Sequence, residues 1–93
     1  MTYELVYWPA ADDVLNELER DPAMAPVLRA IERTLGRLAE DPFAPRLGTT
    51  PFMSEPLGGI NATPARYDEW YVIWQRGSEP MVIDIVLVHQ LRT

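Results

Sequence analysis

The chain has 93 residues, of which 47% are hydrophobic and 24% are charged, so it is long enough for one compact domain with a single core. It contains no cysteine, which excludes disulfides, thiolate metal sites and a cysteine nucleophile. Fourteen acidic residues outnumber eight basic ones and give a net charge of −6, which opposes loose binding to nucleic acid.

All eight basic residues are arginines, whose planar and permanently charged side chains suit phosphate or carboxylate ligands. A codon bias of the genome would explain the absence of lysine equally well. The charge is uneven, because residues 1–42 hold nine acids and four arginines, whereas residues 43–93 hold five acids and four arginines. The C-terminal half is therefore the better host for an anionic ligand, and any contact with RNA must be local.

No apolar run approaches the roughly 20 residues that a bilayer span needs. The first residues, from Met1 to Tyr7, contain no basic segment followed by an apolar one, as a secretory signal would. We therefore expect a soluble, cytoplasmic protein with no membrane partner.

The first half of the chain predicts one strand and two helices. Tyr3 to Trp8 alternates in the manner of a strand. A helix is expected from Pro9 to Arg20, because proline is tolerated at the first helical position and Asp12 and Asp13 suit the positive end of the helix dipole. The pair Asp21-Pro22 predicts the start of a second helix, which should reach Glu40.

The two predicted helices each have an apolar face. In the first helix that face comprises Val14, Leu15 and Leu18, and the second helix has a core-facing stripe within about 100° on a helical wheel. Arg29, Arg33 and Arg37 lie opposite this stripe. They form either a solvated helix face or a contact for phosphate or a partner, and the sequence leaves both interpretations open. The residues of the stripe are Met24, Val27, Leu28, Ile31, Leu35 and Leu38.

A proline-rich connection follows, from Pro42 to about Leu57, in which little regular structure is expected. Loops of that length in small domains are often functional, and Arg46 is the only cation of this one. The segment Gly58 to Ala62 predicts a short strand or sheet edge, and Pro64 marks either its end or a bulge.

The last third of the chain predicts a β-hairpin. Trp70 to Gln75 is an aromatic and β-branched strand, Arg76 to Pro80 a turn, and Met81 to Val88 a second strand whose only charged residue is Asp84. We expect most of this second strand to be buried on both faces. The whole order predicts a two-layer α+β domain spanning residues 1–93, with two helices on a mainly antiparallel, four-stranded sheet.

Five segments of the chain together have a familiar order and spacing. They are residues 3–11, the helix end from Leu35 to Pro42, residues 46–48, the strand from Trp70 to Trp74, and residues 85–89. Through these segments the chain resembles, over almost its whole length, the RelE/ParE superfamily of toxins from bacterial type II toxin–antitoxin systems. The resemblance implies a cytoplasmic toxin that a cognate antitoxin neutralises, with no cofactor or metal and with possible homodimers or hetero-oligomers. RelE-like members cut messenger RNA in the ribosome and so inhibit translation, whereas ParE-like members act on DNA gyrase.

The resemblance also implies the catalytic residues of a metal-independent endoribonuclease. Where the family has Gly-Asp-Tyr-Arg, this chain has residues 68–71, so Tyr71 stands in place of an arginine, and Arg66 is the remaining phosphate ligand. The C-terminal His-Arg followed by tyrosine appears as His89 and Arg92 without the tyrosine. Arg66, Tyr71, His89 and Arg92 are the predicted catalytic residues. His89 is alternatively a structural histidine at the end of a strand.

A second group of residues is predicted to bind RNA. Arg46 would contact phosphate, and Trp70 and Trp74, which share one face of their strand, would stack on bases if that face is open. The same aromatic face could instead hold an antitoxin segment. Three functions therefore remain open: a ribosome-dependent mRNA endoribonuclease, a toxin acting by binding a target such as gyrase, and an inactive interaction module.

Overall fold

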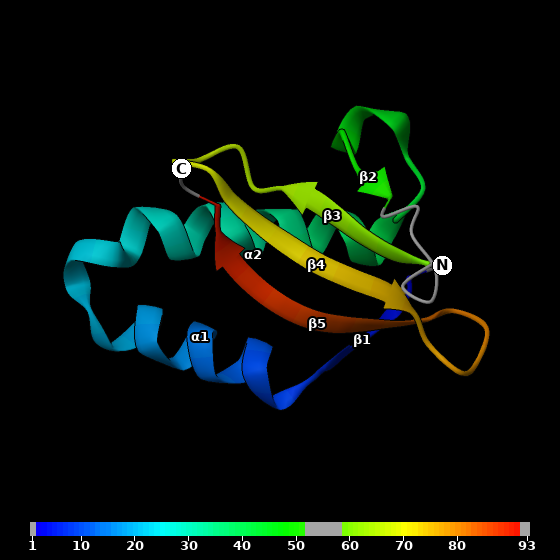
Figure 1. Ribbon diagram of the computed structural model, residues 1–93, viewed down its shortest axis with the longest axis horizontal. Coiled ribbons are helices and arrows are strands. Elements are labelled where there is room, and N and C mark those ends of the chain that lie inside the picture. The colour runs from blue at the N-terminus through cyan, green and yellow to red at the C-terminus, as the bar shows by residue number, and fades with distance from the viewer. Residues whose placement is uncertain (1, 52–58, 92–93) are drawn as a thin grey trace.

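A computed structural model describes residues 2–51 and 59–91 of the chain. Both helices cover one face of a sheet, with α1 packed against β5 and α2 against β4 (Figure 1). This confirms the predicted two-layer α+β architecture. The described elements, in chain order, are β1 Glu4–Tyr7, α1 Pro9–Arg20, the 3-10 helix η1 Pro22–Met24, α2 Ala25–Glu40, the 3-10 helix η2 Pro45–Leu47, β2 Thr50–Pro51, β3 Ile60–Pro64, β4 Trp70–Arg76 and β5 Val82–Gln90.

Within the described residues the sheet has five strands in the order β1-β5-β4-β3-β2, and β1 runs parallel to β5 while all other neighbours are antiparallel. The predicted number of four strands was wrong. The additional strand β2 pairs with β3 through Thr50 opposite Ala62 and Pro51 opposite Asn61. Proline cannot donate to a strand ladder, which explains why β2 is only two residues long and lies at the sheet edge.

The helix boundaries follow from the prolines. Helix α1 begins at Pro9 and ends at Arg20, as predicted. The second helix, predicted from Pro22, instead starts with a 3-10 turn and becomes α-helical at Ala25. Pro26 has no N–H to donate to the carbonyl of Pro22, and the N–H of Ala25 bonds to that carbonyl instead.

The core lies between the helix layer and one face of the sheet. Trp74 is 1% exposed at its centre, and the predicted apolar stripe of α2 faces it with Ile31 and Leu38 fully buried. Arg29, Arg33 and Arg37 are exposed on the other side of α2, as predicted. The stripe and the sheet therefore form one hydrophobic cluster.

Strand β5 is buried on one face only, which corrects the expectation of burial on both. Ile83, Ile85 and Val88 face the helices and are buried, whereas the residues between them are half-buried. The consecutive residues Ile73 and Trp74 of β4 pair with residues 87 and 85 of β5, so β5 has a bulge at this point. Because of the bulge, the buried residues Ile85 and Val88 lie three positions apart instead of two. The cause is the position of both helices on the same face of the sheet.

Candidate functional site

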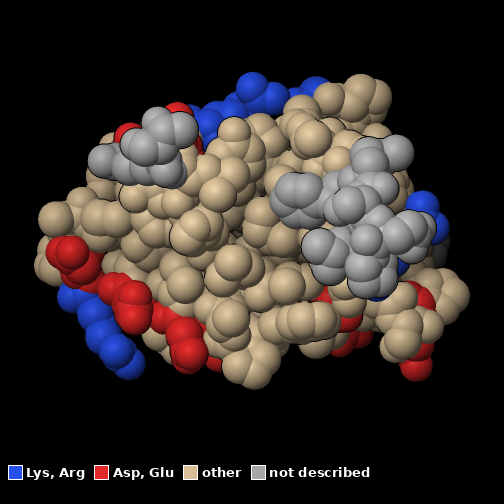
Figure 2. Space-filling model, in the orientation of Figure 1, with Lys and Arg blue, Asp and Glu red and all other residues tan. Residues whose placement is uncertain are grey.

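The sheet face away from the helices, here called the open face, carries few charged groups. Tyr71, Ile73 and Gln75 of β4 point to it and are half-buried, because alternate residues of the strand enter the core. The Nε2 of Gln75 donates a hydrogen bond to Oδ2 of Asp84 at 3.3 Å across the strand pair. Figure 2 shows a largely uncharged central surface with charged side chains toward the rim.

Tyr71 and His89, both predicted catalytic residues, are brought together on the open face. They are direct partners in the register of β4 and β5, and His89 is exposed while Tyr71 is half-buried. Directly opposed residues on antiparallel strands have their Cβ atoms about 5 Å apart. The phenol and the imidazole are therefore neighbours at the end of the hairpin that lies next to the β3–β4 turn.

The β3–β4 turn, residues 65–69, contains Arg66 and has an unusual backbone. Arg66, Asp68 and Glu69 have φ angles of 61°, 47° and 61°, a left-handed conformation that disfavours side chains other than glycine. Each such residue costs on the order of 1 kcal/mol, and strain of this kind is often retained where function needs it. The turn is fixed from β5, because Nε2 of Gln90 donates to the backbone oxygen of Asp68 at 2.9 Å and to its Oδ2 at 3.1 Å.

Arg66 lies against the segment that contains Arg46. One terminal nitrogen of the Arg66 guanidinium donates to the backbone oxygen of Arg46 at 3.0 Å. Gly48 makes this approach possible, because a Cβ at its position would lie 3.0 Å from that nitrogen, and its φ of 70° is left-handed. Two predicted phosphate ligands from distant parts of the chain are thus adjacent.

Two arginines of α2 extend this group. Arg33, Arg37 and Arg46 line one surface hollow of about 610 Å³, and Glu40 is the acid in its lining. We call Arg33, Arg37, Arg46 and Arg66 the arginine rim; basic side chains also gather along the upper edge in Figure 2. The sequence identified Arg33 and Arg37 as either a solvated face or a contact, but it gave no signal that they meet Arg46, because that contact is tertiary.

The two tryptophans predicted to stack on bases lie in the core, so this assignment is corrected. Trp74 is 1% exposed and its Nε1 donates to Oγ1 of Thr63 at 2.8 Å. Trp70 is 9% exposed, and its Nε1 has no hydrogen-bond partner among the described residues. The face they share meets the helices, and at most 9% of either side chain is exposed, which is too little for stacking on a base. The fourth predicted catalytic residue, Arg92, lies outside the described residues.

Within residues 2–51 and 59–91, no three histidine, aspartate or glutamate side chains come together in a group that could hold a metal ion. No helix in the same part of the chain is long and apolar enough to cross a bilayer.

Comparison of the sequence with models of protein families and with curated proteins finds no match. Solved structures are similar over nearly the whole chain. A YoeB/ParE toxin from Agrobacterium tumefaciens has a TM-score of 0.78 at 13% identity, covering 96% of this chain and 99% of that one. The RelBE2 toxin–antitoxin complex from Mycobacterium tuberculosis gives 0.68 at 20% identity, covering 98% and 100%. The E. coli RelBE toxin–antitoxin complex gives 0.67 at 15% identity, covering 98% and 99%. The chain therefore has the fold of the RelE/ParE-like toxins of toxin–antitoxin systems.

Proposed function

We propose that this chain is the toxin of a type II toxin–antitoxin pair and that it inhibits translation as a ribosome-dependent, metal-independent mRNA endoribonuclease. The shared fold supports the first part, since two of the similar structures are toxin–antitoxin complexes. The arginine rim is the observation that carries the second part. Arg33, Arg37 and Arg46 line one hollow, and the guanidinium of Arg66 donates to the backbone oxygen of Arg46.

The rim addresses the electrostatic difficulty of a chain with net charge −6 that approaches RNA. At physiological ionic strength the electrostatic field of an exposed charge decays over about 8 Å. A local group of cations therefore determines the potential near it more strongly than acids on a distant surface do. Guanidinium groups also bind phosphate through paired hydrogen bonds. The rim is thus the part of the described surface suited to a phosphate backbone.

The reaction assigned to this site is a transesterification. His89 takes the proton of the 2′-hydroxyl, the 2′-oxygen attacks the adjacent phosphorus, and the bond to the 5′-oxygen breaks as that oxygen receives a proton. Arg66 stabilises the charge of the pentacovalent phosphorane, and Tyr71, next to His89, orients the imidazole or donates the final proton. Arg92 keeps its predicted role as a second cation for the phosphorane.

The proposal is tested by inducing the chain alone in a bacterial host and mapping mRNA ends within minutes. We expect growth arrest and new 5′ ends at codons occupied by ribosomes. His89→Ala and Arg66→Ala should each reduce cleavage on the order of 10²-fold or more, whereas Arg20→Ala, an exposed arginine at the end of α1, should not. Cleavage unaffected by the first two changes would remove both residues from the mechanism.

A second candidate is a toxin that acts by binding a target such as DNA gyrase. This candidate is favoured by the open face, because no described strand presents an arginine there. Arg76 of β4 lies on the helix side of the sheet, with its guanidinium 4.7 Å from the centre of the Phe43 ring. Arrest with altered plasmid supercoiling and intact mRNA would support this candidate. Expression without any arrest would leave an inactive interaction module.

A further inference from the structure

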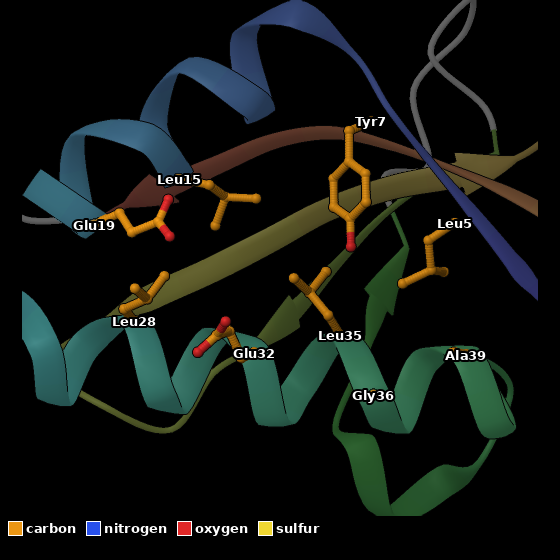
Figure 3. A pocket seen from close by; sticks show the side chains of 9 residues that line it. All are labelled: Leu5, Tyr7, Leu15, Glu19, Leu28, Glu32, Leu35, Gly36 and Ala39. Atoms are coloured by element: carbon orange, nitrogen blue, oxygen red, sulfur yellow. The ribbon is translucent and has the colours of Figure 1, made fainter.

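A second hollow lies on an adjacent face of α2, between this helix, α1 and β1. It has a volume of about 390 Å³, and its apolar walls come from all three elements. Figure 3 shows the Tyr7 hydroxyl pointing from β1 toward α2, and Glu19 and Glu32 beside the space between the two helices. We call this the acidic hollow. Its lining residues are Leu5, Tyr7, Leu15, Glu19, Leu28, Glu32, Leu35, Gly36 and Ala39.

The charges of the acidic hollow are of one sign. Glu19 and Glu32 are the charged residues of its lining, and neither has an ion-pair or hydrogen-bond partner within the described residues. The electrostatic environment of the hollow also acts on the Tyr7 phenol. Burial raises its pKa above the ordinary value of 10.0, and the carboxylates of Asp12 and Glu32 raise it further. A ligand for this hollow should therefore bring positive charge.

The apolar part of the hollow defines the rest of the ligand. Leu5, Leu15 and Leu28 are only partly buried, although they pack against the core. A volume near 390 Å³ is at the lower end of ordinary binding pockets and suits a few side chains of a peptide segment. An apolar side chain would cover the leucines, while a neighbouring lysine or arginine would pair with the carboxylates.

We propose that the acidic hollow binds a segment of the antitoxin in which an apolar side chain is flanked by lysine or arginine. The identity of the partner as an antitoxin rests on the proposed function; the chemistry of the segment rests on the hollow alone. Nucleic acid is excluded as the occupant, because its phosphates would face two carboxylates and the described part of the lining holds no cation. Gly36 lines both this hollow and the hollow of the arginine rim, so the occupant would lie next to the rim.

The direct test is an NMR titration of the ¹⁵N-labelled chain with two synthetic 12-residue peptides, one with leucines flanked by lysines and one with the same leucines flanked by glutamates. The lysine peptide should shift amide signals of α1, α2 and β1, and its affinity should fall about tenfold between 50 and 500 mM salt. The glutamate peptide should not bind. Equal binding of both peptides, or shifts confined to the open face, would overturn the proposal.

Variants separate the charge of the hollow from the charge of the whole chain. Glu19→Gln combined with Glu32→Gln should weaken binding of the lysine peptide at least tenfold. Glu17→Gln combined with Glu79→Gln removes the same two charges from exposed positions outside the lining and should change binding less than twofold. Equal effects of the two double variants would show that only net charge matters, and would contradict a specific site.

The partner assignment has a separate readout. A library of peptides co-expressed with the chain can be selected for relief of growth arrest, and the rescuing peptides should carry apolar residues flanked by lysine or arginine. Rescue by acidic peptides would contradict the inference. If the lysine peptide binds the hollow but expression causes no arrest, the proposed function fails while the binding site stands.

Discussion

The arginine rim and the acidic hollow lie on adjacent faces of one helix. Arg33 and Arg37 of α2 line a hollow with Arg46, whereas Glu32 lines the acidic hollow with Glu19 of α1. Gly36 lines both hollows. The net charge of −6 is therefore an average over two surfaces of opposite sign and predicts the partner of neither.

The two regions also differ in how the chain forms them. The acidic hollow comes from β1, α1 and α2, which follow one another in the first 40 residues. The rim depends on contacts between distant segments: Arg66 bonds to the backbone of Arg46, and Thr63 bonds to Thr49. We expect the rim to be lost before the hollow when long-range contacts are weakened.

The largest effect is expected when two rim charges are removed. Arg37→Gln combined with Arg46→Gln should weaken binding of a single-stranded RNA oligonucleotide on the order of 100-fold at low salt, since each lost charge-assisted contact contributes about 1.5 kcal/mol or more. The slope of log affinity against log salt should decrease by about 1.4. Filter binding at several salt concentrations measures both. Arg20→Gln combined with Arg76→Gln is the matched control, and an equal loss there would contradict a localised site.

Thr63→Val should loosen the rim and leave the hollow intact. Its Oγ1 accepts a hydrogen bond from Nε1 of Trp74 at 2.8 Å and bonds to Oγ1 of Thr49 at 2.6 Å. Valine lacks this hydroxyl and leaves the buried Nε1–H of Trp74 without an acceptor, which lowers the free energy of unfolding by about 1–3 kcal/mol. Denaturant unfolding should show this loss, while the lysine peptide still binds. Thr50→Val, at an exposed position in β2, is the control; an equal loss there would refute the role of the buried pair.

Gly36→Ala should stabilise the helix that separates the two regions. Apart from its chain neighbours and the backbone of its own helix, a Cβ at Gly36 would meet no described atom within 4 Å, so alanine should raise the free energy of unfolding by up to about 1 kcal/mol. Gly77→Ala is the contrasting variant, because its Cβ would lie 2.7 Å from Cγ1 of Val82 and should destabilise. Denaturant midpoints that move in the same direction for both variants would contradict this account of the packing.

The smallest effect concerns the pKa of Tyr7. The folded chain holds the phenolic proton more tightly than the unfolded chain, so this contribution to stability is complete below about pH 10 and is lost as the pH rises through the higher folded pKa. Glu32→Gln should lower the pKa of Tyr7 toward 10.0, and Glu17→Gln should not. NMR titration of ¹³C-labelled tyrosine measures both. An unchanged pKa of Tyr7 in Glu32→Gln would show that the Glu32 carboxylate does not act on the Tyr7 phenol.

Local sequence patterns predicted the helices and most of the sheet. Pro9 set the start of α1, and the apolar spacing of α2 identified Val27, Ile31, Leu35 and Leu38 as core residues. These features depend on residues within one or two turns of each other. The hairpin of β4 and β5 was likewise evident from its β-branched and aromatic residues.

Features that depend on distant contacts were missed. Alternation placed Trp70 and Trp74 on one face of β4 but could not say that this face meets the helices. The strand β2 was not predicted, because it contains a proline. The hollow lined by Arg33, Arg37 and Arg46 depends on the position of η2 next to α2, which is a tertiary contact. Arg46 and Arg66 stay predicted phosphate ligands, and the sequence gives no sign of the hydrogen bond from the Arg66 guanidinium to the backbone oxygen of Arg46.

The most direct test of the account is co-sedimentation of the purified chain with bacterial ribosomes at physiological salt. The wild-type chain and the Arg20→Gln, Arg76→Gln variant should both sediment with ribosomes, because the arginine rim is intact in each. The Arg37→Gln, Arg46→Gln variant, with the same net charge as this control, should stay in the supernatant. Equal sedimentation of the two double variants would contradict the claim that the arginine rim carries this chain to its RNA target.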